Sequence, residues 1–118
     1  MNFEQFNSII AQYPLNILYD SSISKEYQYI CPDVCRFLIV KFSIKPNFIE
    51  VPYNFRYSKK NQHIVPIDKK HKMATTYFAY KHISNPTEKE VHTEISRLIK
   101  KIKQVQYKLK LSNIEKDF

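Results

Sequence analysis

The sequence contains no glycine among its 118 residues. An average composition of roughly 7% would supply about eight. Phosphate-binding P-loops, dinucleotide-binding fingerprints and nucleophile elbows need glycine where the backbone takes positive φ or approaches a ligand closely, so these three kinds of site are excluded. Turns must use asparagine, aspartate and proline instead, and we expect Asn47, Asn61 and Asp68 to lie in turns.

Long apolar runs are also missing. The longest one, from Phe37 to Val40, is far too short to span a bilayer. The first residues carry Glu4 and no basic side chain, so no secretory signal is predicted. With 43% apolar and 14% aromatic residues, the chain is expected to form a single domain over residues 1–118. We therefore expect an intracellular protein, in the cytoplasm of its own or a host cell, with no membrane partner and no cofactor.

The net charge of +8 is unevenly distributed. Residues 1–58 hold five basic and five acidic side chains, whereas residues 59–118 hold fourteen basic and six acidic ones. An excess of positive charge in one part of a folded domain favours a polyanionic partner. The alternative is that the positive charge has no function and reflects base composition alone. Sixteen of the nineteen basic residues are lysine, a residue that an AT-rich genome supplies without selection for charge.

One long helix is predicted between Asn85 and Leu109. Its apolar residues follow one another at alternating spacings of four and three, which places them on one stripe: Val91, Ile95, Leu98, Ile102, Val105 and Leu109. Two N-terminal caps fit equally well, Asn85 with Glu88 and Thr87 with Glu90. A shorter helix is predicted over Asn2 to Gln12, with Asn2 as its cap.

The sequence pattern predicts strands in the segments between these helices. We expect a short strand at Leu15 to Tyr19, a helical turn or strand at Ser24 to Ile30, and a central strand at Cys35 to Ile44. Alternation then predicts one strand from Phe48 to Tyr57, with Pro52 at an edge or bulge, a hairpin return over Gln62 to Ile67, and a last strand over Met73 to Ile83. The fold class is therefore α+β: an antiparallel β-meander of four to six strands, covered on one face by both helices.

This meander predicts a basic pole. If successive strands alternate in direction, the turn at Lys45 and the loop at residues 69–72 lie at one end of the sheet, and the long helix runs back toward it. The residues expected there, as candidates for nucleic-acid binding, are Lys45, Lys69, Lys70, His71, Lys72, Lys101, Lys108 and Lys110. Lysine acts as a point charge without the bidentate fork of arginine, so contacts to phosphates without base-specific readout are expected.

The apolar stripe of the long helix allows two interpretations. It packs on the chain's own sheet, or it forms a homodimer with a second copy as in a coiled coil. Its end, residues 105–118, outruns the strands and is expected to project, so Leu109, Leu111 and Ile114 are candidates for binding a protein partner.

Three other groups of residues are further functional candidates. Tyr53, Tyr57 and Tyr80 with Arg56 can stack on unpaired bases, although the alternation places Tyr53 and Tyr57 in the core. Cys31 and Cys35 can bind zinc with two of the four histidines, or simply pack. His71 among lysines, or His63 with Asp68, are the best catalytic candidates, but neither has a recognisable orienting partner, so no metal and no enzyme activity are predicted.

The leading hypothesis is a small non-enzymatic binding protein that attaches to nucleic acid or a nucleoprotein assembly. The alternative is an accessory protein of the viral or phage type that binds and inhibits or scaffolds another protein, as anti-defence proteins do, through its C-terminal helix and the edge strand at Pro52.

Overall fold

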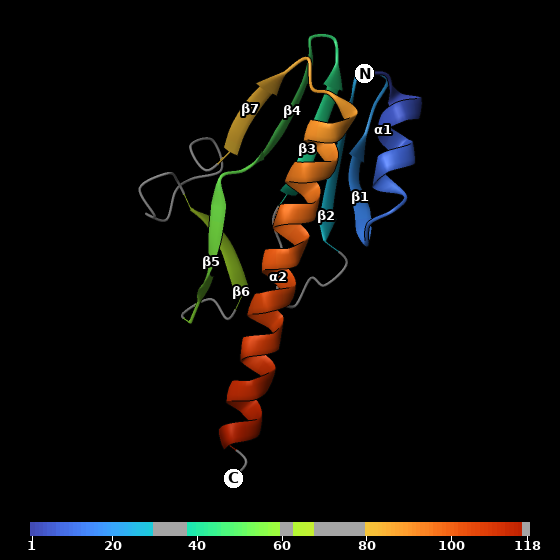
Figure 1. Ribbon diagram of the computed structural model, residues 1–118. Coiled ribbons are helices and arrows are strands. Elements are labelled where there is room, and N and C mark those ends of the chain that lie inside the picture. Colours follow the sequence, from blue (N-terminus) through green and yellow to red (C-terminus); the bar gives the residue numbers. More distant parts are fainter. Residues whose placement is uncertain (30–37, 60–62, 68–79, 117–118) are drawn as a thin grey trace.

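The computed structural model describes residues 1–29, 38–59, 63–67 and 80–116 (Figure 1). Five strands form one antiparallel sheet in the order β1-β2-β3-β4-β7. They are β1 (Leu15–Asp20), β2 (Ser24–Tyr29), β3 (Leu38–Ile44), β4 (Asn47–Pro52) and β7 (Tyr80–Ser84). A second pair is formed by β5 (Asn54–Ser58) and β6 (His63–Ile67), and the helices are α1 (Phe3–Ile10) and α2 (Glu88–Lys116). The predicted α+β class is confirmed.

The short helix α1 begins where the sequence predicts. The side chain of Asn2 accepts a hydrogen bond from the Gln5 N–H at 2.8 Å, and the Gln5 side chain accepts one from the Asn2 N–H at 2.9 Å. This capping box satisfies two N–H groups that the first helical turn leaves unpaired. The inner face of α1 is buried on the sheet, where the Phe6 ring stacks on Phe42 with centroids 4.4 Å apart.

The long helix α2 uses the second of its two predicted caps. The Thr87 hydroxyl accepts a hydrogen bond from the Glu90 N–H at 3.1 Å, and the Glu90 carboxylate accepts one from the Thr87 N–H at 3.0 Å. Asn85 has a φ of 48°, in the left-handed region, whereas an N-cap residue needs an extended backbone. The cap predicted at Asn85 is therefore wrong, and the helix begins at Glu88.

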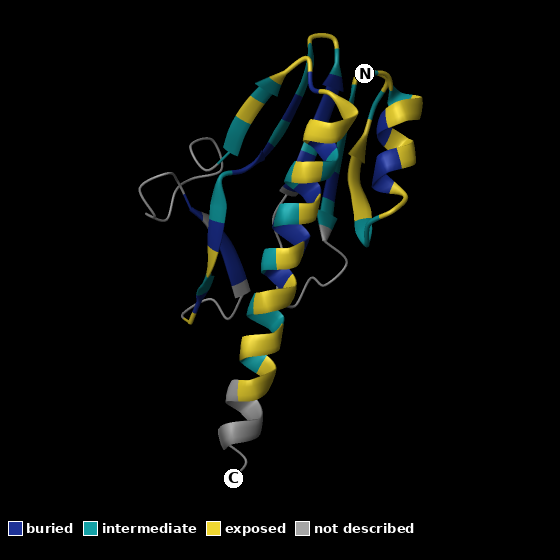
Figure 2. Cartoon of the chain, viewed as in Figure 1, coloured by how far each residue is buried: buried dark blue, intermediate teal, exposed yellow. Residues whose placement is uncertain are grey.

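The apolar stripe of α2 packs on the chain's own core. Val91, Ile95, Leu98 and Ile102 are completely buried, together with residues of α1, β3, β4 and the β5–β6 pair. Val105 is partly buried against the same cluster, and Ile102 is the last buried residue of α2 in the part of the helix whose side chains are described. Figure 2 shows the dark-blue residues of α2 confined to its upper turns, so the first two heptads cover the chain's own sheet, which is the first of the two interpretations of the stripe.

The predicted strand from Phe48 to Tyr57 is in fact two strands. It bends at Tyr53, so β4 stays in the main sheet and β5 pairs with β6. The sequence predicts an edge or a bulge at Pro52; β4 as a whole lies between β3 and β7, but its pairing with β3 stops at Glu50, so among the described strands Pro52 pairs on one side only, with Tyr80. The ambiguous segment at Ser24 is a strand, and of the predicted last strand only its end, in β7, lies within the described residues.

Of the helices in the described ranges, none has the length and apolar character that crossing a bilayer requires.

Candidate functional site

The predicted basic pole does not form as expected. Lys45 lies in the β3–β4 turn, and α2 starts beside this turn, because the Asn85 N–H donates to the Asn47 carbonyl at 2.8 Å. From there the helix runs away from the turn (Figure 1). At a rise of 1.5 Å per residue, Lys101 is about 20 Å and Lys110 about 33 Å along the axis from Glu88. The structure therefore separates Lys45 from the three predicted lysines of α2.

The cause of this error is the route of the β5–β6 pair. Because this pair leaves the main sheet after Pro52, β7 pairs directly with β4 and runs antiparallel to it, with Phe48 opposite Ser84. The last strand thus ends at the Lys45 turn instead of the opposite end. The predicted residues 69–72 lie outside the described residues, as do Cys31 and Cys35 of the zinc hypothesis.

Positive charge gathers instead along the middle and lower turns of α2. Residues 96–111, which we call the cationic segment, contain no acidic residue. Their six basic side chains are Arg97, Lys100, Lys101, Lys103, Lys108 and Lys110. Four of these lysines are exposed, and only Lys101 is half-buried. Lys101 and the two predicted residues beyond it belong to this segment. Lys100 and Lys103 were not predicted as site residues, although the sequence places them in the same segment.

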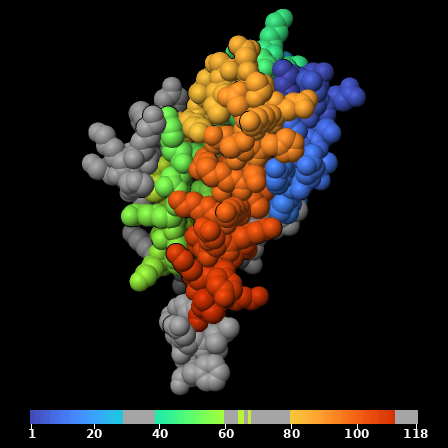
Figure 3. Space-filling view, in the orientation of Figure 1, coloured from blue at the N-terminus to red at the C-terminus, as the bar shows by residue number. Residues whose placement is uncertain are grey.

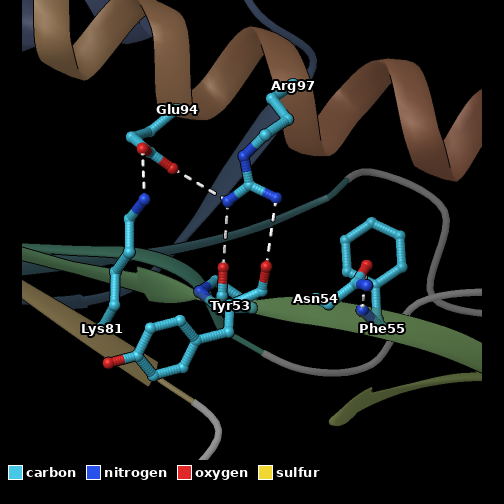
Figure 4. Close-up of polar contacts among 7 residues, drawn as sticks. Tyr53, Asn54, Phe55, Lys81, Glu94 and Arg97 are labelled. Carbon is cyan, nitrogen blue, oxygen red and sulfur yellow. Dashed lines mark hydrogen bonds and ion pairs between the residues drawn. The ribbon is translucent and has the colours of Figure 1, made fainter. Parts of the chain in front are cut away.

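Among the described residues, Arg97 differs from the lysines of the cationic segment, because it makes hydrogen bonds and an ion pair within the protein. Its guanidinium donates to the carbonyls of Pro52 and Tyr53 at 3.1 and 3.2 Å, where β4 gives way to β5 (Figure 4). It also pairs with the Glu94 carboxylate at 2.8 Å, and Glu94 in turn pairs with Lys81 of β7. Burial favours the neutral form of Glu94, but the hydrogen bonds and charges of Lys81 and Arg97 outweigh it, so the pKa of this carboxyl is lowered.

The lysines of the cationic segment lack such partners. Within the described ranges of the chain, no carboxylate lies in ion-pair distance of any of them; the ion pairs there join Asp20 to Lys25, Glu50 to His82, and Glu94 to Lys81 and Arg97. Lys101 places its Nζ 5.4 Å from the centre of the Phe55 ring, and partial burial, with the charge of Arg97, lowers its pKa. The exposed ammonium groups are therefore open to an external anion.

A hollow of about 590 Å³ lies beside the cationic segment. One wall is the chain between α1 and β1, with Tyr13 and Pro14, and the other is the face of α2 that carries Lys100, Lys103 and Tyr107. Figure 3 shows α2, in orange and red, running down this face of the molecule beside the blue N-terminal part. Such a volume falls within the range of about 300–1,000 Å³ that is typical of ligand sites.

The candidates for protein binding lie on the lower turns of α2, which extend past the strands in Figure 1. Leu109 is partly exposed, and Leu111 is 42% exposed. The side chain of Ile114 lies outside the described residues. A second apolar surface was missed: the edge strand β1 exposes Ile17, Leu18 and Tyr19, each about half.

The remaining predicted residues come from several elements of the fold. Tyr57 packs against the core, as the alternation of its strand predicts, whereas Arg56 is exposed. His92 shares a hydrogen bond of 3.0 Å with the Tyr13 hydroxyl, and His82 lies 3.9 Å from Glu50. In the described part of the chain, no three histidine, cysteine or acidic side chains gather as metal ligands do. His71, Asp68 and the side chain of His63 lie outside that part.

No protein-family model, curated protein or solved structure matches this chain.

Proposed function

We propose that this chain is a small non-enzymatic protein that docks on nucleic acid, free or within a nucleoprotein assembly, through phosphate contacts made by the cationic segment of α2. The observation that carries this proposal is the run of five lysines without a carboxylate partner among the described residues. Ammonium groups gain affinity at phosphates by releasing condensed counterions. Because five of the six cations are lysine, binding is not base-specific. Such a partner agrees with an intracellular location.

The salt dependence of binding tests this proposal. The four exposed lysines, with one phosphate contact each, predict a slope of log affinity against log salt of about −2.8 on a single strand, or roughly a 50-fold loss of affinity between 50 and 200 mM salt. Fluorescence anisotropy with a labelled oligonucleotide measures this slope. An affinity that changes less than about threefold over this range contradicts phosphate contacts as its source.

A matched pair of variants locates the site. Lys108→Glu/Lys110→Glu reverses two charges of the cationic segment, and Lys45→Glu/Lys89→Glu reverses two exposed charges at the other end of the molecule. Both variants change the net charge equally. We expect the first to weaken oligonucleotide binding at least about tenfold, and the second to weaken it less than about threefold. Equal losses would mean that only the net charge matters and that the cationic segment is not the site.

The exposed edge of β1 supports a second candidate function, which is binding to another protein. Only β2 pairs with β1 among the described strands, and Ile17, Leu18 and Tyr19 are exposed along it. An open edge with apolar side chains can accept an added strand from a partner. Ile17→Lys/Tyr19→Lys would abolish binding to a protein target and leave oligonucleotide binding unchanged, which distinguishes this function from the first.

A further inference from the structure

The hollow beside the cationic segment combines an apolar floor with a cationic rim. Pro14 and Ile99 contribute aliphatic surface, and the Ile99 side chain is almost completely buried beneath it. Tyr13 stands at one wall, held there by the hydrogen bond of its hydroxyl to His92 on α2. The hollow therefore offers flat apolar surface that is already positioned before any ligand binds.

Two lysines on one side of α2 line this hollow. Lys100 and Lys103 are three residues apart, so their Cβ atoms are neighbours at about 5–6 Å on the helix surface. Both are exposed, and neither has a carboxylate partner in the described part of the chain. This arrangement suits an anion with more than one charged group close together, such as two successive phosphates.

Tyr107 is the third feature of the hollow. It lies four residues beyond Lys103, on the same side of α2, and its side chain is 64% exposed. Among the described residues it makes no ring–ring contact. An exposed aromatic ring between lysines is the combination with which single-strand-binding proteins stack bases while they hold phosphates.

We propose that this hollow takes an unpaired base, stacked on Tyr107, while Lys100 and Lys103 bind the flanking phosphates. The ligand class is therefore single-stranded nucleic acid. Bases within a duplex are stacked on one another and present only their edges, so their faces do not reach a protein ring. This inference rests on the proposed function, because it assigns the kind of nucleic acid that the cationic segment binds.

The experiment compares three probes of equal length by fluorescence anisotropy at one salt concentration: oligo(dT), a fully abasic deoxyribose-phosphate strand, and a mixed-sequence duplex. The abasic strand keeps the phosphates and lacks only the bases. We expect oligo(dT) to bind at least about fivefold more tightly than the abasic strand, since stacking on an aromatic ring is worth that factor or more. Tyr107→Ser should remove this preference, and Tyr107→Phe should keep it. Tyr19→Ser, at an exposed tyrosine of β1 away from the hollow, serves as the control and should also keep it.

A second readout does not depend on affinity. The chain has no tryptophan, so Tyr107→Trp creates a single reporter in the hollow. Stacking predicts that oligo(dT) quenches its fluorescence and that the abasic strand does not.

The outcomes separate the two proposals. Equal affinities for oligo(dT) and the abasic strand, or a duplex that binds more tightly than either, overturn the stacking inference and leave phosphate binding by the cationic segment intact. An unquenched tryptophan in a variant that still binds oligo(dT) has the same consequence. Failure of all three probes to bind at low salt overturns the proposed function itself.

Discussion

At the scale of single residues, an asparagine adopts the left-handed backbone conformation that glycine adopts in most other chains. Asn85, between β7 and α2, has a φ of 48°. This left-handed conformation costs most residues about 1–2 kcal/mol, whereas glycine and, to a lesser degree, asparagine adopt it readily. The absence of glycine predicts such a use of asparagine in turns, although the sequence pattern pointed to other positions, and at Asn85 it suggested a helix cap.

Substitution of Asn85 tests this role. Asn85→Ala should lower the free energy of unfolding by about 1 kcal/mol, because alanine gains nothing that offsets the left-handed backbone. Asn85→Gly should change it by less than about 0.5 kcal/mol, since the relief of strain and the greater entropy of the unfolded chain oppose each other. Urea denaturation of the three proteins measures both values. Equal stabilities of the alanine and glycine variants would contradict a conformational role for this position.

The two helix starts show what local sequence can and cannot decide. The capping box of Asn2 and Gln5 was predictable because both partners are local. At α2 two local patterns competed, and the choice depended on Asn47, which accepts the Asn85 N–H from 38 residues away in the chain and holds it at the turn. A distant hydrogen bond of this kind leaves no trace in the local pattern.

At the scale of elements, α2 divides into a part that completes the core and a part that is free of it. The spacing of its apolar residues is the same in both parts, so the sequence predicted the helix and its buried face but could not show where the burial stops. The structure shows the change after Ile102, which is completely buried, whereas Leu109 is only partly buried.

Alanine substitutions on the two sides of this boundary should differ sharply. Ile102→Ala removes buried side-chain volume and should lower the free energy of unfolding by about 2–5 kcal/mol. Leu109→Ala should lower it by less than about 1 kcal/mol, because the side chain is partly in water already. Urea denaturation at two protein concentrations measures both. A large, concentration-dependent loss in Leu109→Ala would instead indicate the homodimer through the helix stripe.

The break between β4 and β5 could not be predicted from the apolar pattern either. Alternating apolar residues continue across Tyr53, so periodicity predicts one strand. Pro52 cannot donate to a ladder, and Arg97 of α2 takes the carbonyls of Pro52 and Tyr53, so the polar groups at the bend are satisfied from another element. The sequence marked the weak point through its proline but not the helix residue that stabilises the bend.

At the scale of the whole molecule, the sequence shows where the positive charge lies along the chain, and the topology decides which parts of the molecule it lies beside. The excess of lysine in the second half of the chain was visible in the sequence, and it supports a polyanionic partner. Whether Lys45 lies near the lysines of α2 depended on the direction of β7, and that direction was set by the departure of the β5–β6 pair from the sheet. The cationic segment itself is contiguous in the sequence, and the fold adds that Lys100 and Lys103 are exposed and line the hollow.

In the same topology, Glu94 of α2 connects the helix with β7 and, through Arg97, with the β4–β5 bend. It pairs with Lys81 of β7 and with Arg97, which in turn holds the β4–β5 bend. These partners lower the pKa of Glu94 below its ordinary value of 4.5. A carboxyl whose pKa is lower in the folded than in the unfolded chain contributes stability that is fully present above the unfolded value. That contribution is lost as the pH falls through the folded value, because the protonated group no longer pairs with the two cations.

Glu94→Gln should therefore lower the free energy of unfolding by about 1–2 kcal/mol at pH 7, and the difference from the native protein should shrink as the pH falls below about 4.5. Urea denaturation at pH 7 and pH 3 measures this difference directly, and effects of the other carboxyls cancel in it. Glu88→Gln, at an exposed residue of the same helix, is the control and should stay within about 0.5 kcal/mol of the native protein at both pH values. A Glu94→Gln deficit that is equally large at pH 3 would mean that packing of the side chain, and not its charge, joins β7, α2 and the bend.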